Sequence, residues 1–248
     1  MSSVWEQLEA RRGRLRELRL GTDPALRAVK NHFRVPFVWG SNALDGISLS
    51  LSETKKILED GMSVGRKPVR EILAAVGLSK CFERMFLLRE ADRVTEDDVL
   101  EYHRLIADSF ENPMEAGLYR RAPAAPDGND HPPPENVAWL VKELLKKCDL
   151  ARFTTHPARL GALFHQGLME ILPFGEGNGR VARVVMSTVF LQHGFPPLVL
   201  DPSQARGYKY GLSVHGRNSE FFENFIADGL VKGLEDFLKA ADEGKMEG

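Results

Sequence analysis

The chain has 248 residues, 43% of them hydrophobic, which is enough to bury one sizeable core, and we expect a single compact unit. The 33 Lys and Arg residues against 35 Asp and Glu leave a net charge of -2, so composition gives no case for nucleic acid or an anionic membrane as partner. No apolar run approaches the roughly 20 residues that cross a bilayer, and the basic start without a following apolar segment leads us to expect no secretory signal. Cys81 and Cys148 form no CxxC pair, so we expect a reducing, cytoplasmic setting.

Helical periodicity dominates along the chain and predicts an all-α protein. The basic run of residues 11–19 carries Leu15 and Leu18, which favours an amphipathic helix with a solvated charged face over a nucleic-acid patch. Ser50 and Glu53 have the spacing of a capping box at the start of a helix. Further helices are predicted over residues 68–90, 95–110, 134–147, 157–171, 178–193 and 221–238.

Residues 112–134 interrupt this pattern. Their prolines and glycines predict an exposed loop, with or without a short hairpin. Long ordered loops in compact domains are often functional, so we interpret the segment as a flap beside a site. A surface loop without a functional role is an equally open alternative.

The stretch "GEGNGR" of residues 175–180 lies between two predicted core helices. Its glycines allow a tight turn, and the first turn of the next helix exposes unpaired N–H groups, which favours an anion site. Arg180 and Arg183 can present planar forks to phosphate oxygens, and Glu176 can hold Mg²⁺ between itself and the phosphates. The alternative is a plain turn followed by surface salt bridges. The P-loop pattern is absent.

In order, Leu172 to Arg183 ("LPFGEGNGRVAR") resembles the signature of Fic-domain proteins, HxFx(D/E)GNGRxxR, at every fixed position except the first. Three further stretches resemble other parts of that family: "PARLGALFH" the preceding helix, "GLYRR" with "PPPENV" the flap, and "ARGYKYGL" the segment that closes the nucleotide site. The resemblance spans residues 37–238. It implies an N-terminal helical segment over 1–36, a Fic domain over 37–240 and a tail over 241–248.

The resemblance implies a Fic fold, a helical bundle with a flap, and transfer of AMP from ATP to a protein hydroxyl. It implies that ATP and Mg²⁺ are the cofactors, with the metal on Glu176. The residues implied to bind the nucleotide are Phe174, Gly177, Asn178, Gly179, Arg180 and Arg183, the last gripping the γ-phosphate. Leu172 stands at the position of the general base and cannot accept a proton.

Upstream, "SNALDG" (Ser41 to Gly46) resembles the inhibitory motif of the family, (S/T)xxxE(G/N). There the acidic residue pairs with the second arginine of the signature, which is Arg183 here. Asp45 is shorter than Glu by one C–C bond, about 1.5 Å, so its reach is an open question. A simple helix cap is the alternative role for Asp45 and Gly46.

The missing base leaves several functional hypotheses. The first is a weakened adenylyltransferase, and the second is a pseudoenzyme whose flap, about residues 117–134, binds a partner protein when nucleotide is bound. His131 is the best replacement base, whereas His165 is expected to be a buried core residue. An acceptor that arrives already ionised would need no base. A kinase-like transfer is disfavoured because Gly179 and Arg180 keep the AMP-transferring pattern, and a homodimer remains open.

Overall fold

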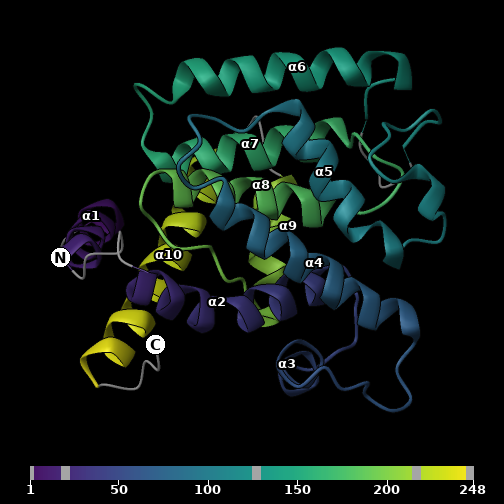
Figure 1. Ribbon diagram of the computed structural model, residues 1–248. Coiled ribbons are helices and arrows are strands. Elements are labelled where there is room, and N and C mark those ends of the chain that lie inside the picture. Colours follow the sequence, from purple (N-terminus) through teal and green to yellow (C-terminus); the bar gives the residue numbers. More distant parts are fainter. Residues whose placement is uncertain (1–2, 18–22, 125–129, 214–218, 244–248) are drawn as a thin grey trace.

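The computed structural model describes residues 3–17, 23–124, 130–213 and 219–243, and these residues confirm the all-α prediction (Figure 1). Among them the elements run, in order, α1 (Val4–Glu17), α2 (Asp23–Leu44), α3 (Leu51–Glu59), α4 (Val69–Leu87), α5 (Glu96–Ile106), η1 (Ala107–Ser109), η2 (Pro113–Glu115), α6 (Pro134–Ala151), α7 (Pro157–Ile171), α8 (Asn178–Gln192), η3 (Pro202–Gln204), α9 (Ala205–Ser213) and α10 (Ser219–Asp242).

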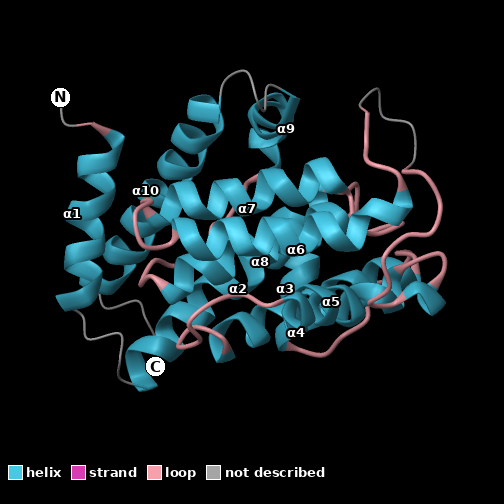
Figure 2. Cartoon of the chain, turned by 90° about the horizontal axis from the view of Figure 1, so that it is seen from above, coloured by secondary structure: helices cyan, strands magenta, loops and turns pink. Residues whose placement is uncertain are grey.

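Two antiparallel helices, α7 and α8, form the centre of the bundle and have the most extensive mutual contact. Helix α6 covers α7, while α4 and α5 pack on α8, as Figures 1 and 2 both show. Small residues allow the close approach: a Cβ at Gly161 would come within 2.3 Å of the Phe190 ring. The loop that joins α7 to α8 is therefore held by two buried helices.

Local sequence signals set several helix boundaries. The Ser50 side chain accepts a hydrogen bond from Glu53 N, and the Glu53 side chain accepts one from Ser50 N, so the predicted capping box is present at the start of α3. Thr95 and Asp98 form a second capping box at the start of α5. The boundary expected after residue 36 falls inside α2, which contains Pro36.

Helix α1 packs against α10 at one side of the bundle (Figure 1). Its basic residues are used in this contact: Arg11 pairs with Glu235, and Arg14 lies 3.2 Å from a carboxylate oxygen of Asp242. Leu15 is buried, as the amphipathic pattern predicts. Leu18 lies outside the described residues.

The predicted loop region of residues 112–134 carries only the turn η2 among its described residues, which form a loop rather than a hairpin, and η1 lies just before it. Residues 125–129 of this flap lie outside the described residues. Cys81 and Cys148 are buried free thiols. Among the helices that the structure describes, none combines the length and apolar character that a membrane span requires.

Candidate functional site

The junction between α7 and α8 is built from strained and buried backbone. Leu172 caps α7 in the left-handed conformation (φ 43°, ψ 68°), and its N–H donates to Leu168 O at 2.9 Å. Phe174 is 1% exposed, whereas Glu176 projects to the surface. Gly177 then begins α8 at φ 79°, with no side-chain cap among the described residues. The first N–H groups of α8 are thus left for an anion.

Two glycines of this junction have no room for a side chain. A Cβ at Gly177 would lie 2.8 Å from the Phe110 ring, and its positive φ favours glycine as well. A Cβ at Gly179 would lie 2.9 Å from Arg183 Nη1 and 3.0 Å from Asp45 Oδ1. Gly179 therefore lets the charged groups close over the start of α8.

Asn178, expected in the nucleotide cradle, uses its side chain to fasten the loop. Its Oδ1 accepts from Phe174 N at 2.9 Å, and its Nδ2 donates to Phe174 O at 2.8 Å. This two-way bridge fixes the turn, so only the backbone of Asn178 faces the anion position. The ring of Phe174 stacks on His103 at 3.8 Å and anchors the loop in the core.

Arg183 is almost fully buried, and all three of its guanidinium nitrogens donate hydrogen bonds. Its Nε donates to Ser41 Oγ at 2.7 Å, and its Nη2 donates to Ser41 O at 2.8 Å and to Asp45 Oδ1 at 2.7 Å. Its Nη1 donates to Tyr208 OH at 3.0 Å. Burial alone would lower the pKa of Arg183, but Asp45 and Tyr208 outweigh it and the pKa is raised. Arg183 is a permanent buried cation.

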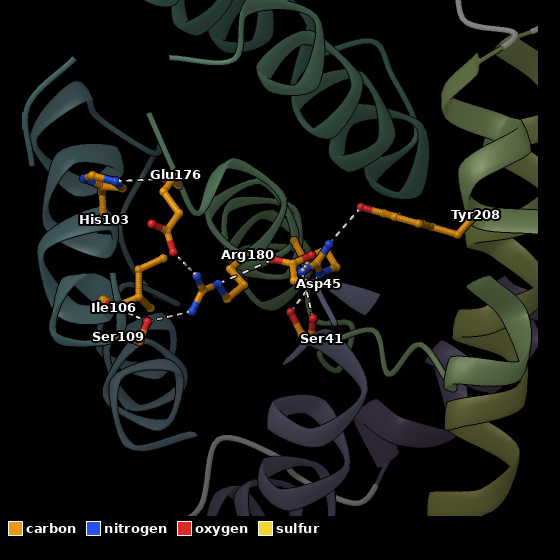
Figure 3. Close-up of polar contacts among 9 residues, drawn as sticks. Ser41, Asp45, His103, Ile106, Ser109, Glu176, Arg180 and Tyr208 are labelled. Carbon is orange, nitrogen blue, oxygen red and sulfur yellow. Dashed lines mark hydrogen bonds and ion pairs between the residues drawn. The ribbon is translucent and has the colours of Figure 1, made fainter. Parts of the chain in front are cut away.

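Arg180 also lies beside Asp45 (Figure 3). Its Nη1 donates to Ser109 Oγ at 2.9 Å, and its Nη2 lies 3.9 Å from Glu176 Oε1. Its Nε lies 3.4 Å from Asp45 Oδ2 and has no hydrogen-bond partner among the described residues. Burial lowers the pKa of Arg180, and Asp45 offsets only part of this effect.

The carboxylate of Asp45 therefore bridges both arginines, one oxygen toward each. The shorter side chain does reach Arg183, because the last turn of α2 brings Asp45 over the N-terminus of α8. Gly46 follows at φ 86° and lets the chain turn away, so the helix-end geometry and the arginine contact coexist. The side chain of Asp45 is a quarter exposed, which leaves the pair open to displacement from solvent.

The backbone carbonyls at Leu172 and Ile171 accept hydrogen bonds from an arginine of the flap. Arg120 of the flap donates from Nε to Leu172 O at 2.7 Å and from Nη2 to Ile171 O at 3.3 Å. The same Nη2 donates to Pro132 O at 2.6 Å. A buried cation thus caps the carbonyl end of α7 and ties both ends of the flap to it.

The histidines near the site have fixed structural partners. Gly117 N donates to His103 Nδ1 at 2.9 Å, so Nε2 carries the proton and donates to Glu176 O at 3.1 Å. Burial lowers the pKa of His103 to about 4. His165 is fully buried, as expected, and its Nε2 lies 2.8 Å from Tyr208 OH. Burial, reinforced by Arg183, lowers the pKa of His165 to about 3.

His131, the expected replacement base, lies at the flap end of α7. Its Nδ1 is 2.9 Å from Glu170 O, two residues before Leu172. It lines a hollow of about 700 Å³ bounded by the flap, α6, α7 and α9. The structure thus brings His131 to the site region without placing it in contact with the arginines.

Sequence reasoning missed several residues that shape this site. Ser109 and His103 lie outside any recognised motif, and only the folded chain brings them to the α8 junction. Arg120 and Tyr208 belong to stretches that resemble the flap and the closing segment, but their partners could not be deduced. The adjacent pair Arg120 and Arg121, in the stretch that resembles the flap, was the available signal for Arg120.

A family model described as "Fic/DOC family" matches residues 93–190. A protein adenylyltransferase Fic of Nematostella vectensis is 30% identical over 248 residues, covering 94% of this chain and 55% of the relative. The protein of the same name in Aedes aegypti is 28% identical over 243 residues, covering 96% of this chain and 48% of the relative. The chain thus spans about half the length of the curated relatives it matches.

Solved structures of Fic proteins are also similar to this chain. A structure of Fic-1 (aa134–508) from C. elegans superposes with a TM-score of 0.84 at 27% identity, covering 96% of this chain and 71% of that one. A Fic-domain-containing signalling protein of Bacteroides thetaiotaomicron superposes with a TM-score of 0.86 at 23% identity, covering 97% of this chain and 98% of that one. The second likeness supports the fold alone.

Proposed function

Since the chain contains a domain of the Fic/DOC family, we propose that it binds ATP with Mg²⁺ at the α7–α8 junction and that its transfer of AMP to a protein hydroxyl is weak or lost. Relatives named protein adenylyltransferase Fic support the nucleotide and the reaction class. Leu172 supports the weakened transfer, because a general base contributes about 10² to 10⁴ in rate.

One observation carries the nucleotide site: two buried guanidinium groups and the open end of α8 converge on the place that Asp45 now holds. A carboxylate there presents two anionic oxygens to the same donors that a phosphate would use. Asp45 acts as a brake on ATP binding by occupying this position.

The remaining residues take roles that fit the triphosphate. The amides of residues 177–179 and Arg180 hold the α- and β-phosphates, and Arg183 takes the γ-phosphate once Asp45 has left. Glu176 suits Mg²⁺, because it is a surface carboxylate beside the anion position and one carboxylate plus phosphate oxygens is a normal Mg²⁺ environment. The metal ion supplies charge neutralisation on the phosphates.

In the transfer itself, an acceptor oxygen attacks the α-phosphorus and the bond to pyrophosphate breaks. A neutral hydroxyl must also lose a proton, and Leu172 cannot take it. A protein that keeps the cradle and lacks the base is suited to a second role, as a nucleotide-dependent module whose flap binds a partner protein. Leu172 is the observation that favours this role.

Thermal unfolding with Mg²⁺-ATP tests the proposal. We expect ATP to raise the Tm of Asp45→Gly by more than it raises the Tm of the natural chain, and we expect Arg180→Ala to abolish the shift in both backgrounds. Arg159→Ala, which removes an arginine far from the cradle, should keep the shift. An unchanged Tm of Asp45→Gly at millimolar Mg²⁺-ATP would refute the nucleotide site.

A further inference from the structure

The hydrogen bonds that hold Arg183 come from two separate parts of the molecule. Those to Ser41 and Asp45 lie at the end of α2, which is the segment that the proposed function requires to yield to a nucleotide. The remaining one goes to Tyr208 on α9, whose side chain reaches toward the Asp45 contact (Figure 3). Release of the end of α2 therefore leaves Tyr208 as the partner of Arg183 that stays in place.

A buried histidine holds the hydroxyl group of Tyr208 in turn. The hydroxyl lies 2.8 Å from His165 Nε2 on α7. Arginine can only donate, so Arg183 occupies a lone pair of the Tyr208 oxygen. Among the described residues, His165 Nε2 is then the acceptor for the phenolic proton. The hydrogen bonds thus run in one direction, from Arg183 through Tyr208 to His165.

His165 suits this role because it stays uncharged at neutral pH. Burial, reinforced by Arg183, lowers the pKa of His165 to about 3, so Nε2 keeps its lone pair. The ring proton then lies on Nδ1, which has no hydrogen-bond partner among the described residues. A buried N–H without a partner costs stability, and an apolar side chain would avoid that cost. The acceptor for Tyr208 explains this histidine better than packing does.

Packing against α10 fixes the pair formed by Tyr208 and His165. The ring of Phe222 lies 6.2 Å from the Tyr208 ring and 5.3 Å from the His165 ring, measured between centroids. A Cβ at Gly211, in the turn after Tyr208, would lie 2.6 Å from the Phe222 ring, so α9 lies close against α10. The pair is therefore anchored in α7, α9 and α10, and none of these elements belongs to the end of α2.

We propose that Tyr208, oriented by His165, is the positioning residue that keeps Arg183 directed at the γ-phosphate once Asp45 has left, an inference that rests on the proposed function. Tyr208 acts here through the direction of the guanidinium group and not through contact with phosphate. Without the hydroxyl, an arginine released from α2 gains rotamer freedom that it must lose again on binding. Because ADP has no γ-phosphate, the pair should strengthen the binding of ATP and leave that of ADP unchanged.

The test compares Tyr208→Phe with the natural residue, both in the Asp45→Gly background, by calorimetric titration with Mg²⁺-ATP and Mg²⁺-ADP. Phe keeps the ring and its packing on Phe222 and removes only the hydroxyl. We expect the Kd of ATP to rise about tenfold, as for loss of a hydrogen bond to a charged group, and the Kd of ADP to stay within about twofold. The ratio of the two Kd values decides, because a general loss of structure would weaken both.

Tyr102→Phe is the matched control. Tyr102 is also fully buried, and its hydroxyl is bonded to Thr188 Oγ1 at 2.7 Å instead of to an arginine. Its loss should lower the Tm and leave the ratio of the two Kd values unchanged. A second pair of variants examines His165. Gln can offer an acceptor near the position of Nε2, so His165→Gln should keep the ratio closer to the natural one than His165→Leu does.

The outcomes separate this inference from the function on which it rests. An unchanged ratio in Tyr208→Phe overturns the role of Tyr208 and leaves the proposed function standing. A natural ratio in His165→Leu overturns the part assigned to His165. Absence of ATP binding to Asp45→Gly alone overturns both proposals. Tyr208→Phe is the mildest of these changes, and it decides the matter if His165→Leu does not fold.

Discussion

The two sides of the α7–α8 junction differ in the functional groups that they carry. On the α8 side, both arginines are buried and held by charged or hydroxyl partners from η1, α9 and the C-terminal end of α2. On the α7 side, Leu172 offers an alkyl chain in a left-handed backbone, and its carbonyl is bound by Arg120. In the proposed function, binding of phosphate and activation of the acceptor belong to separate groups, so one can be lost without the other.

The largest effect should come from restoring a base. Leu172→His in the Asp45→Gly background should raise AMP incorporation from α-labelled ATP at least about tenfold, since a positioned base contributes about 10² to 10⁴. Leu172→Asn is the matched control, because Asn tolerates the left-handed backbone and cannot act as a base. Equal incorporation by the two variants would show that the α7 side does not limit transfer.

The second effect concerns Asp45, which links the α8 side to α2. Asp45→Gly should lower the free energy of unfolding by about 3 kcal/mol, because it leaves two buried cations without their anion, and should tighten Mg²⁺-ATP binding at the same time. Denaturant titration and calorimetry measure the two changes. Asp45→Asn, which keeps the shape and loses the charge, should lie between. A variant that loses stability and gains no affinity would refute the brake.

A third effect concerns the flap. Arg120→Met should cost about 2 kcal/mol, because several backbone carbonyls lose a charged donor at once. Hydrogen exchange should locate the loss at residues 117–123 and 171–174. Arg120→Lys should recover part of the protection through a single ammonium group. Uniform loss across the bundle would contradict a local tether.

The smallest effect, taken per pH unit, is the response to acid. His103 and His165 have folded pKa values of about 4 and about 3, below the ordinary value of 6.5. Below about pH 6.5 the unfolded chain therefore binds protons that the folded chain does not, so stability is present above that pH and falls as pH drops toward 4. Each histidine contributes at most about 1.4 kcal/mol per pH unit. His103→Gln should weaken the pH dependence of the free energy of unfolding between about pH 6.5 and 4. An unchanged pH dependence would contradict the lowered pKa of His103.

Local features of the sequence predicted most of the fold. Capping residues such as Ser50 and the left-handed Gly177 act within one turn, so their signals are readable in order along the chain. Helix α7 carries clear apolar periodicity, whereas α8 is buried at every position from Arg180 to Phe190 and therefore shows a weaker one. The sequence predicts a helix start near Asn178, and α8 begins there.

The site was harder to predict, because its contacts join distant segments. Arg183 and Asp45 are 138 positions apart, and the reach of the shorter acid depends on where α2 ends in space. Asn178 presents a different difficulty. Its residue type suits an anion site, yet its side chain forms hydrogen bonds with the backbone of Phe174 within the turn. Composition identifies which groups can bind phosphate, whereas the backbone decides which of them face it.

The close contact at Gly40 limits how Asp45 and the end of α2 can move. A Cβ at this position would lie 2.1 Å from Leu200 O, so α2 is clamped against the 195–200 segment one turn before Asp45. Sliding or tilting of the whole helix would break that clamp. Admission of nucleotide should thus require only fraying of the final turn, between Gly40 and Gly46, a motion as fast as ordinary loop fluctuations.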